Sequence, residues 1–395
     1  MPAVYERSIV HLNVVDFAVA VERMVDNRLN TRPVIIASRE TARAAVYDMS
    51  EEAYQAGVRK GMRLHRAMRR CREARILTPH PGLYERAMRA MLKQALPYSP
   101  LIEPGDRDGH LFVDVTGTHR LFGPPVDVAW RLGRKIQCDL GLKPIWSVAS
   151  NKLVAKVATR LVKPLGEYIV GAGEEEKILA PLPLKLIPGI DRTDRLSLLE
   201  FNIVKASQVA VLSLAQLEMV SGRRAGFLYE AVRGIDRSPV FSVGRKHPAI
   251  HVDQEFGEDT NELPALERAL YCLAEAAGHK LRRRHRAASR IRITIDYTDG
   301  IRCARRGTVT PPSADHRDLF LAARKSLLSA WGRRVRVRHI HFSVVRLVFP
   351  PAQLNLFSVD REKEKKTGDL VDAVDRIRAR FGWKAVQMGR VLSGV

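Results

Sequence analysis

Residues 8–25 read SIVHLNVVDFAVAVERMV, and this stretch decides the fold of the first part of the chain. Its first eight residues are mostly β-branched and apolar, which is typical of a buried strand. From Phe17 to Val25 the apolar residues follow a helical period instead. Outward from this unit, short apolar runs alternate with helical patterns, and we expect further strands at 34–37, 110–115 and 144–147. This alternation predicts an α/β or α+β first domain with a mixed sheet.

The rest of the chain divides into three further parts. Residues 178–235 are helical in pattern throughout and contain a tight turn, Pro188-Gly189-Ile190. From His247 the pattern reads helix, two strands, helix and a last strand, which predicts a compact α+β unit followed by a polar tail. We therefore expect a multidomain α+β and α/β protein with parts at 1–177, 178–236, 237–246 (a linker), 247–350 and 351–395.

Length and composition exclude several classes of protein. A chain of 395 residues with 46% hydrophobic and 28% charged residues is globular, and it is too long for one ordinary core. No apolar run approaches eighteen residues, and the first 21 residues lack the layout of a signal peptide. The four cysteines are far apart, which predicts buried free thiols in a reducing cytoplasm, not a zinc site or a disulfide frame.

The charge of the chain predicts a polyanionic partner. Lys and Arg number 66 against 43 Asp and Glu, giving a net charge of +23. Between Gly278 and Leu347, eighteen basic residues stand against four acidic ones. Arginine dominates this block, which favours bidentate phosphate contacts over a merely solvated basic face. The candidate nucleic-acid-binding residues are Lys280, Arg282, Arg283, Arg284, Arg286, Arg290, Arg292, Arg305, Arg306, Arg333, Arg334, Arg336 and Arg338.

Four motifs in order resemble the Y-family (UmuC/DinB-type) translesion DNA polymerases over nearly the whole chain. Residues 11–22 (HLNVVDFAVAVE) are similar to the family's opening HIDMDAFFASVE, and 53–62 (AYQAGVRKGM) to its finger segment. The others are YSP at 98–100 with FVDVTG at 112–117, and SNKLVAKVA at 150–158 followed by Lys163-Pro164. The resemblance implies a right-hand architecture: palm, fingers, a helical thumb with a helix-hairpin-helix turn, and an α+β little finger.

The chain departs from the family at the metal ligands. The resemblance implies two magnesium ions held by three carboxylates, which neutralise a triphosphate and activate the attacking oxygen. The aligned positions carry Asn13, Gly109 and His110. An amide, an absent side chain and an imidazole do not supply the anionic oxygens that Mg²⁺ prefers. We therefore expect no catalytic residues, no bound metal and no cofactor.

The nucleotide-contacting set departs as well. The positions of the triphosphate-gripping Tyr and Arg carry Glu51 and Tyr54, and that of the ribonucleotide-excluding aromatic carries Ala18. Only Lys156 remains of this set. In the thumb turn, Asp191 replaces a glycine that would let backbone N–H groups approach a phosphate, so an aspartate there weakens the expectation of thumb contact with DNA.

Two alternatives stay open. Asp16, Asp106 and Asp108 are nearby acids that could act as displaced Mg²⁺ ligands, which would make the chain an active error-prone translesion DNA polymerase. Asp108 is one position from the aligned acidic pair, and strand alternation predicts that it faces away. The other alternative is a regulator that only competes for a sliding clamp.

The tail contains a short motif, QLNLF at 353–357. It resembles the peptide that binds the bacterial sliding clamp, in which a glutamine bonds at the rim of a groove and apolar anchors fill it. The residues concerned are Gln353, Leu354, Leu356 and Phe357. The alternative is that these apolar residues pack on the preceding domain.

A Y-family body without catalytic carboxylates, but with a clamp motif, resembles the ImuB-type mutasome subunits. The resemblance implies a non-catalytic scaffold in DNA repair and SOS-type mutagenesis, bound to duplex or primer-template DNA. Its implied partners are the bacterial sliding clamp, a separate polymerase and recombinase-type proteins. The implied location is the bacterial cytoplasm at the nucleoid, away from membranes.

Overall fold

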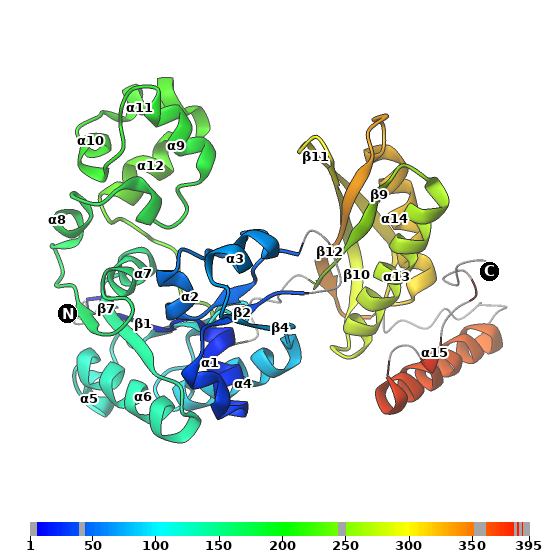
Figure 1. The fold of residues 1–395 in the computed structure, drawn as a ribbon, viewed down its shortest axis with the longest axis horizontal. Helices are drawn as coiled ribbons and strands as arrows, with labels where there is room; N and C mark the ends of the chain where they lie inside the picture. Colours follow the sequence, from blue (N-terminus) through cyan, green and yellow to red (C-terminus); the bar gives the residue numbers. More distant parts are fainter. Residues whose placement is uncertain are drawn as a thin grey trace. The chain divides into compact units, whose positions relative to one another are not determined.

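The computed structural model describes residues 6–38, 44–243, 250–350, 361–382, 385–386 and 389. The chain forms two compact units, Met1–Lys246 and His247–Val395 (Figure 1). None of the described helices is long and apolar enough to cross a membrane. Among the described cysteines, none forms a disulfide, but Cys138 is exposed, so the expectation of four buried thiols was wrong for this residue.

A five-stranded mixed sheet is the centre of the first unit, in the order β5-β6-β1-β7-β8. Its middle strand β1 is buried at all six residues and pairs antiparallel with both β6 and β7, whereas β7 and β8 are parallel. This confirms the mixed α/β sheet that the sequence predicts. The strands are β1 (Ile9–Val14), β5 (Ile102–Pro104), β6 (His110–Asp114), β7 (Pro144–Ala149) and β8 (Glu167–Ile169).

Helices cover both faces of this sheet (Figure 1). Val10, Leu12 and Val14 of β1 pack in one core with three helices, and Ile9 packs on the other face with α7. His11 and Asn13 share the face of Ile9, because side chains alternate along a strand. The three helices are α1 (Phe17–Val25), α4 (Pro81–Ala95) and α6 (Pro125–Leu140); α7 is Lys152–Leu161, and the short α5 is His119–Phe122.

A small three-stranded sheet, ordered β3-β2-β4, is inserted between α1 and α4. It has a separate core that includes Ile35, Val58 and Ala67. Its elements are β2 (Val34–Ile36), β3 (Asp48–Met49), β4 (Arg75–Leu77), α2 (Glu51–Gln55) and α3 (Leu64–Arg70), after a 3-10 turn at Asn27–Thr31.

The last part of the first unit is helical, as the pattern predicts. Asp191 begins α9 as its N-cap, with its side chain accepting a hydrogen bond from the Asp194 amide in a reciprocal capping box. The elements are α8 (Glu175–Leu179), α9 (Arg192–Leu199), α10 (Ala206–Ala210), α11 (Leu214–Ser221), α12 (Ala225–Val232), and 3-10 turns at Leu184–Leu186 and Gly222–Arg224.

The second unit is a four-stranded antiparallel sheet, ordered β11-β10-β12-β9, with helices packed on one face (Figure 1). Its first described element is the strand β9, so the prediction of a helix starting at His247 was wrong. The helix α13 follows this strand. The elements are β9 (Ile250–Thr260), α13 (Leu263–Arg282), β10 (Ala287–Tyr297), β11 (Arg302–Ser313), α14 (His316–Ala330), β12 (Val337–Val348) and α15 (Arg361–Phe381).

Candidate functional site

The three positions aligned with the family's metal ligands lie together at one end of the central sheet. Asn13 is directly opposite His110 across the β1–β6 ladder, and the Val14 amide donates to the Gly109 carbonyl at 3.0 Å. Asn13 is only 2% exposed, and its Nδ2 has no hydrogen-bond partner. A buried amide left unpaired costs free energy, so this position is specialised for something other than core packing.

Gly109 has a backbone that leaves no room for a side chain. Its φ is +76°, a left-handed conformation that side-chain-bearing residues rarely adopt. A Cβ built on Gly109 would lie 2.7 Å from the Val14 carbonyl oxygen and 2.8 Å from Cβ of Phe17. An aspartate at this position would therefore need the backbone to rearrange.

His110 is held by a second buried histidine. Its Nδ1 is 3.0 Å from Nε2 of His11, and Nδ1 of His11 is 2.8 Å from the Thr159 hydroxyl. Burial, and then the charge of Lys156, lowers the pKa of His110 to about 3. Burial and the neighbouring His110 lower the pKa of His11 well below its ordinary value. Both imidazoles are therefore neutral near pH 7.

Basic side chains gather beside this histidine pair. Lys156 and Arg160 come from α7, and Lys163 follows that helix. Burial and the neighbouring Arg160 lower the pKa of Lys156, while burial and Lys60 lower that of Lys163. Partial burial of each group contributes most to these shifts, and repulsion between neighbouring cations adds to it. Lys156, the one predicted nucleotide-contacting residue, is therefore half-buried in a cluster of cations.

The nearby acids do not converge on Asn13. Asp16 stands in the left-handed region at the start of α1 with φ 49°, and burial together with Asp48 raises its pKa to about 7. The Asp108 carboxylate accepts from the His110 amide at 3.2 Å, and the exposed Asp106 pairs with Arg107. Within the described ranges, these acids are not among the side chains grouped closely enough to hold a metal ion.

Asp48 and Lys60 belong to this neighbourhood, although the sequence reasoning did not single them out. The Asp48 carboxylate accepts from the Ala18 amide at 3.0 Å and pairs with Lys60 at 2.8 Å. Asp48 is recognised as part of the site only by its buried position in β3, next to the start of α1, because no local sequence motif surrounds it. The residues at the aligned positions thus do not fit a pair of Mg²⁺ ions, because they offer no carboxylate oxygen.

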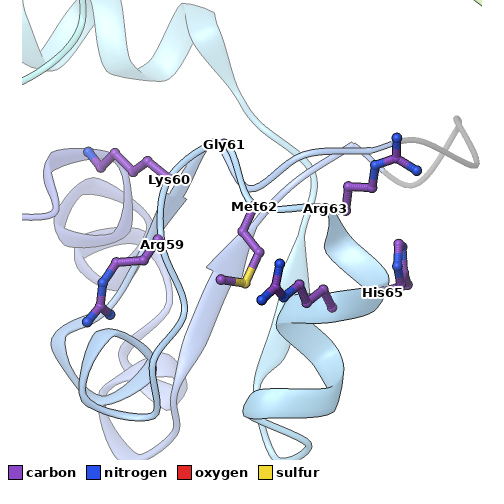
Figure 2. Close-up of a pocket in the computed structure, with 7 residues that line it drawn as sticks. Arg59, Lys60, Gly61, Met62, Arg63 and His65 are labelled. Carbon is purple, nitrogen blue, oxygen red and sulfur yellow. The ribbon is translucent and has the colours of Figure 1, made fainter. Parts of the chain in front are cut away.

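The residues at the finger positions are engaged in contacts within the fold. Glu51 accepts from the Gln55 amide, Tyr54 lies under the Arg59 guanidinium at 3.8 Å, and Ala18 is packed in the core at 1% exposure. A hollow of about 540 Å³ adjoins them. Figure 2 shows its walls, with Arg59 and Lys60 on one side of Met62 and Arg63 and His65 on the other.

The predicted DNA-binding residues separate into three groups in the second unit. Arg292 pairs in register with Arg306, and Arg290 with Arg346, on the sheet face opposite α13 and α14. The neighbouring strands therefore carry an arginine patch, which we define as Arg290, Arg292, Arg306 and Arg346.

Other residues of the predicted set are engaged inside the second unit. Arg282 binds Asp375, Arg333 binds Asp299, and Arg338 binds Glu255, at 2.7–3.2 Å. Lys280 donates to the His251 carbonyl, and Arg286 lies over the Phe349 ring at 3.5 Å. The remaining predicted residues lie at the end of α13, on β11 and before or in β12: Arg283, Arg284, Arg305, Arg334 and Arg336. The clamp motif, Gln353 to Phe357, lies outside the described residues.

Comparisons with known proteins identify the family. Residues 12–160 match the model of the impB/mucB/samB family, and residues 247–356 match its C-terminal domain. The DNA polymerase IV of Dehalococcoides mccartyi (strain CBDB1) is 30% identical over 386 residues, covering 97% of each chain. That of Caulobacter vibrioides is 29% identical over 389 residues, covering 98% of this chain and 94% of the relative. The chain belongs to the Y-family (UmuC/DinB-type) of DNA polymerases.

Solved structures show that the Y-family chain has the right-hand polymerase fold. A Y-family DNA polymerase chimera of Dbh and Dpo4 has a TM-score of 0.74 at 19% identity. DinB from Sulfolobus solfataricus has a TM-score of 0.61 at 19% identity. Each covers 87% of this chain and all of the matched one. The predicted fold class is thereby confirmed.

Proposed function

We propose that this Y-family chain takes part in translesion DNA synthesis as a DNA-binding subunit that does not itself transfer nucleotides. One observation carries the proposal: the aligned metal positions hold an amide, a glycine with φ +76° and a neutral histidine bonded to His11. Nucleotidyl transfer with two metals needs carboxylate charge at this place. These three positions offer hydrogen-bonding side chains and backbone atoms instead of carboxylates.

The electrostatics of the site support the same proposal. Two Mg²⁺ ions bring four positive charges, and Lys156, Arg160 and Lys163 already surround the position with positive charge. Cation repulsion in a partly dehydrated pocket disfavours metal entry. The same pocket suits an anion, so a DNA phosphate or a phosphate-bearing ligand is the species that it would attract.

The arginine patch is the element we propose for DNA binding. It lies on neighbouring antiparallel strands, which give its guanidinium groups fixed spacing along a phosphate backbone. An insertion ternary complex of Dbh DNA polymerase matches the fold with a TM-score of 0.63 at 19% identity. The DNA polymerase name of the relatives supports DNA as the partner of this chain as well.

The proposal of a clamp and of protein partners is based on the sequence alone. We propose that Gln353, Leu354, Leu356 and Phe357 bind a bacterial sliding clamp and that a separate polymerase synthesises across the lesion. Recombinase-type proteins and an SOS-type damage response complete the proposed setting. Replacing Leu356 and Phe357 by alanine removes both apolar anchors, so co-elution of the full chain with the clamp should be lost, while retained binding would exclude this motif as the contact.

A second candidate function is an active translesion DNA polymerase with displaced metal ligands. The relatives named DNA polymerase IV favour it, as does the pair Asp16 and Asp48, because burial and then the neighbouring Asp48 raise the pKa of Asp16. A metal bridging this pair would lie beside the aligned site and not in it.

Primer extension separates the two candidates. The wild-type chain should bind primer-template DNA and extend no primer with Mg²⁺ or Mn²⁺, on damaged or undamaged template. An Asp16→Ala, Asp48→Ala, Asp106→Ala, Asp108→Ala variant is the matched control, and an active Y-family polymerase is the positive control. Extension by wild type that this variant loses would establish displaced ligands and end the scaffold proposal.

A further inference from the structure

The sheet of the second unit carries a histidine pair on the face opposite its helices. His339 and His341 are two residues apart on β12, so both project from the same face. The strand β12 lies between β9 and β10, and each neighbour places a carboxylate beside the pair: Asp253 on β9 and Asp296 on β10. Three strands thus bring imidazole and carboxylate groups to one place.

The distances within this cluster are short. His339 Nε2 is 2.9 Å from the Asp253 carboxylate, and His341 Nε2 is 3.0 Å from that of Asp296. The two imidazole rings are 3.9 Å apart between centroids. Asp253, His339 and His341 offer ligand atoms that all lie within 4.8 Å of one another, and the described part of the chain holds no other such set of three.

We propose that Asp253, His339 and His341 bind a divalent transition metal of the zinc class. Imidazole nitrogen and carboxylate oxygen are ligands that zinc takes at about 2.0–2.2 Å, which places the ligand atoms roughly 3.3 Å apart. Because the ligand atoms already lie within 4.8 Å of one another, small rotations of the exposed Asp253 side chain and of the two half-buried imidazoles would bring them to that spacing. Two imidazoles make the site unsuited to Mg²⁺, which prefers oxygen ligands.

The surroundings fix the ligands and leave one coordination position for another group. Asp296 accepts from His341 and is itself held by the Arg302 guanidinium at 2.5 Å, so it orients the imidazole as outer partners of metal sites do. Arg338 and Glu255 pair beside the site, and Lys280 acts on Asp253. With three protein ligands, the fourth position would take water or a phosphate oxygen.

This inference is independent of whether the first unit transfers nucleotides. The site lies entirely in the second unit, on the sheet face of the arginine patch. A metal here would add a positive charge to that face without any role in the aligned polymerase site. Failure of the scaffold proposal in primer extension therefore leaves the metal proposal untouched, and the reverse also holds.

Zinc titration of the full chain tests the proposal. After chelator treatment and dialysis, wild type should bind one Zn²⁺ ion that His339→Gln and His341→Gln each bind at least tenfold more weakly. His251→Gln is the matched control, because His251 lies on β9 and bonds to Ser343 outside the cluster. The chain has 12 histidines and 4 cysteines, so the difference between variants and control is the readout.

Cobalt supplies a second readout of the same site. Co²⁺ bound by two imidazoles and a carboxylate should give a visible absorption band in wild type and His251→Gln that Asp253→Asn and His341→Gln lose. Circular dichroism of each chelated variant separates loss of ligands from loss of fold. The proposal is overturned if wild type takes up no zinc, or if folded histidine variants bind the same number of ions with the same affinity as wild type.

Discussion

At Gly109, where the family has an acid, the backbone conformation itself leaves no room for a side chain. At +76° its φ suits glycine, and the space that a Cβ would need is occupied by Val14 and Phe17. Restoring Asn13→Asp, Gly109→Asp and His110→Glu together therefore adds strain as well as charge. An acid at this position would therefore need a change of local conformation as well as of side chain.

Alanine substitution measures that difference. Gly61 has nearly the same φ, +77°, with open space for 4 Å around the place a Cβ would take, so Gly61→Ala isolates the cost of the conformation. Gly109→Ala adds overlap with Val14 and Phe17 and should lower the free energy of unfolding by about 1–3 kcal/mol more. Urea denaturation of both variants gives the difference, and equal decreases would mean that the site relaxes without strain.

The histidine pair predicts sensitivity to acid. The pKa of His110 is about 3 in the folded chain against about 6.5 when unfolded, so below pH 6.5 the unfolded state binds more protons. Stability should therefore fall as the pH drops from 7.5 to 5.5, by about 1 kcal/mol for this residue. Urea unfolding of His110→Gln at both pH values should show a smaller decrease in stability than wild type. Parallel decreases in the two proteins would contradict the buried neutral histidine.

At this scale the sequence predicts positions better than partners. Asn13, Gly109 and His110 could be placed at one site because the family motifs flank them. The bond between His110 and His11 depends on which face of β1 meets α7, and the pairing of Asp16 with Asp48 depends on an inserted sheet. Neither leaves a local pattern. Arg282 was predicted for DNA, but only tertiary structure reveals that Asp375 holds it.

Among the elements, α15 is held to the second unit by buried and half-buried ion pairs. Arg378 and Glu275 form an ion pair at 3.1 Å with side chains only 5% and 6% exposed, and Asp375 binds both Arg282 and His279. The sequence predicts an amphipathic segment at 370–380, and the helix extends from Arg361 to Phe381. Its charge-rich start has no apolar period, so the pattern places the beginning of the helix too late. The strand β9 is missed for a related reason, since its outward residues are charged and it reads as helix.

Breaking the buried pair should release this helix. Glu275→Gln leaves the Arg378 guanidinium buried without its counter-charge, a change that costs about 3 kcal/mol or more in other proteins. Residues 361–382 should then exchange backbone hydrogens faster, as measured by mass spectrometry. Glu267→Gln is the control, because Glu267 also lies on α13. Its pair with Arg324 is more exposed, so its loss should change the exchange of residues 361–382 little. Unchanged exchange in Glu275→Gln would show that other interactions hold α15.

At the scale of the whole molecule, more than half of the net positive charge is concentrated in one stretch of the second unit, where basic residues far outnumber acidic ones. Eighteen of the 66 basic residues lie in the 70 residues from Gly278 to Leu347. Strand register brings four of these arginines together in the arginine patch, whereas helix and loop contacts with acids engage Arg282 and Arg333.

Salt dependence tests that division. Replacing Arg290, Arg292 and Arg306 by alanine should weaken duplex binding for all sequences and reduce the slope of log affinity against log salt by roughly 0.9 for each phosphate that the variant no longer neutralises. A variant with Arg282, Arg333 and Arg338 changed to alanine is the control, since acids already neutralise those groups, and its slope should change less. Equal slopes in all three proteins would remove the patch as the DNA-binding surface.

The attachment of α15 to the second unit also limits the reach of the segment between β12 and α15. The strand β12 ends at Val348 and α15 begins at Arg361, and both belong to the second unit, so the QLNLF motif lies in the sequence between two elements of that unit. The twelve residues between them extend at most roughly 43 Å, which would keep a partner bound to the motif near the sheet. If α15 detached, the motif would be connected to the unit only through β12, and the local concentration of its partner would fall. In the proposed complex, the Arg378–Glu275 ion pair would therefore limit how far the clamp can move from the arginine patch.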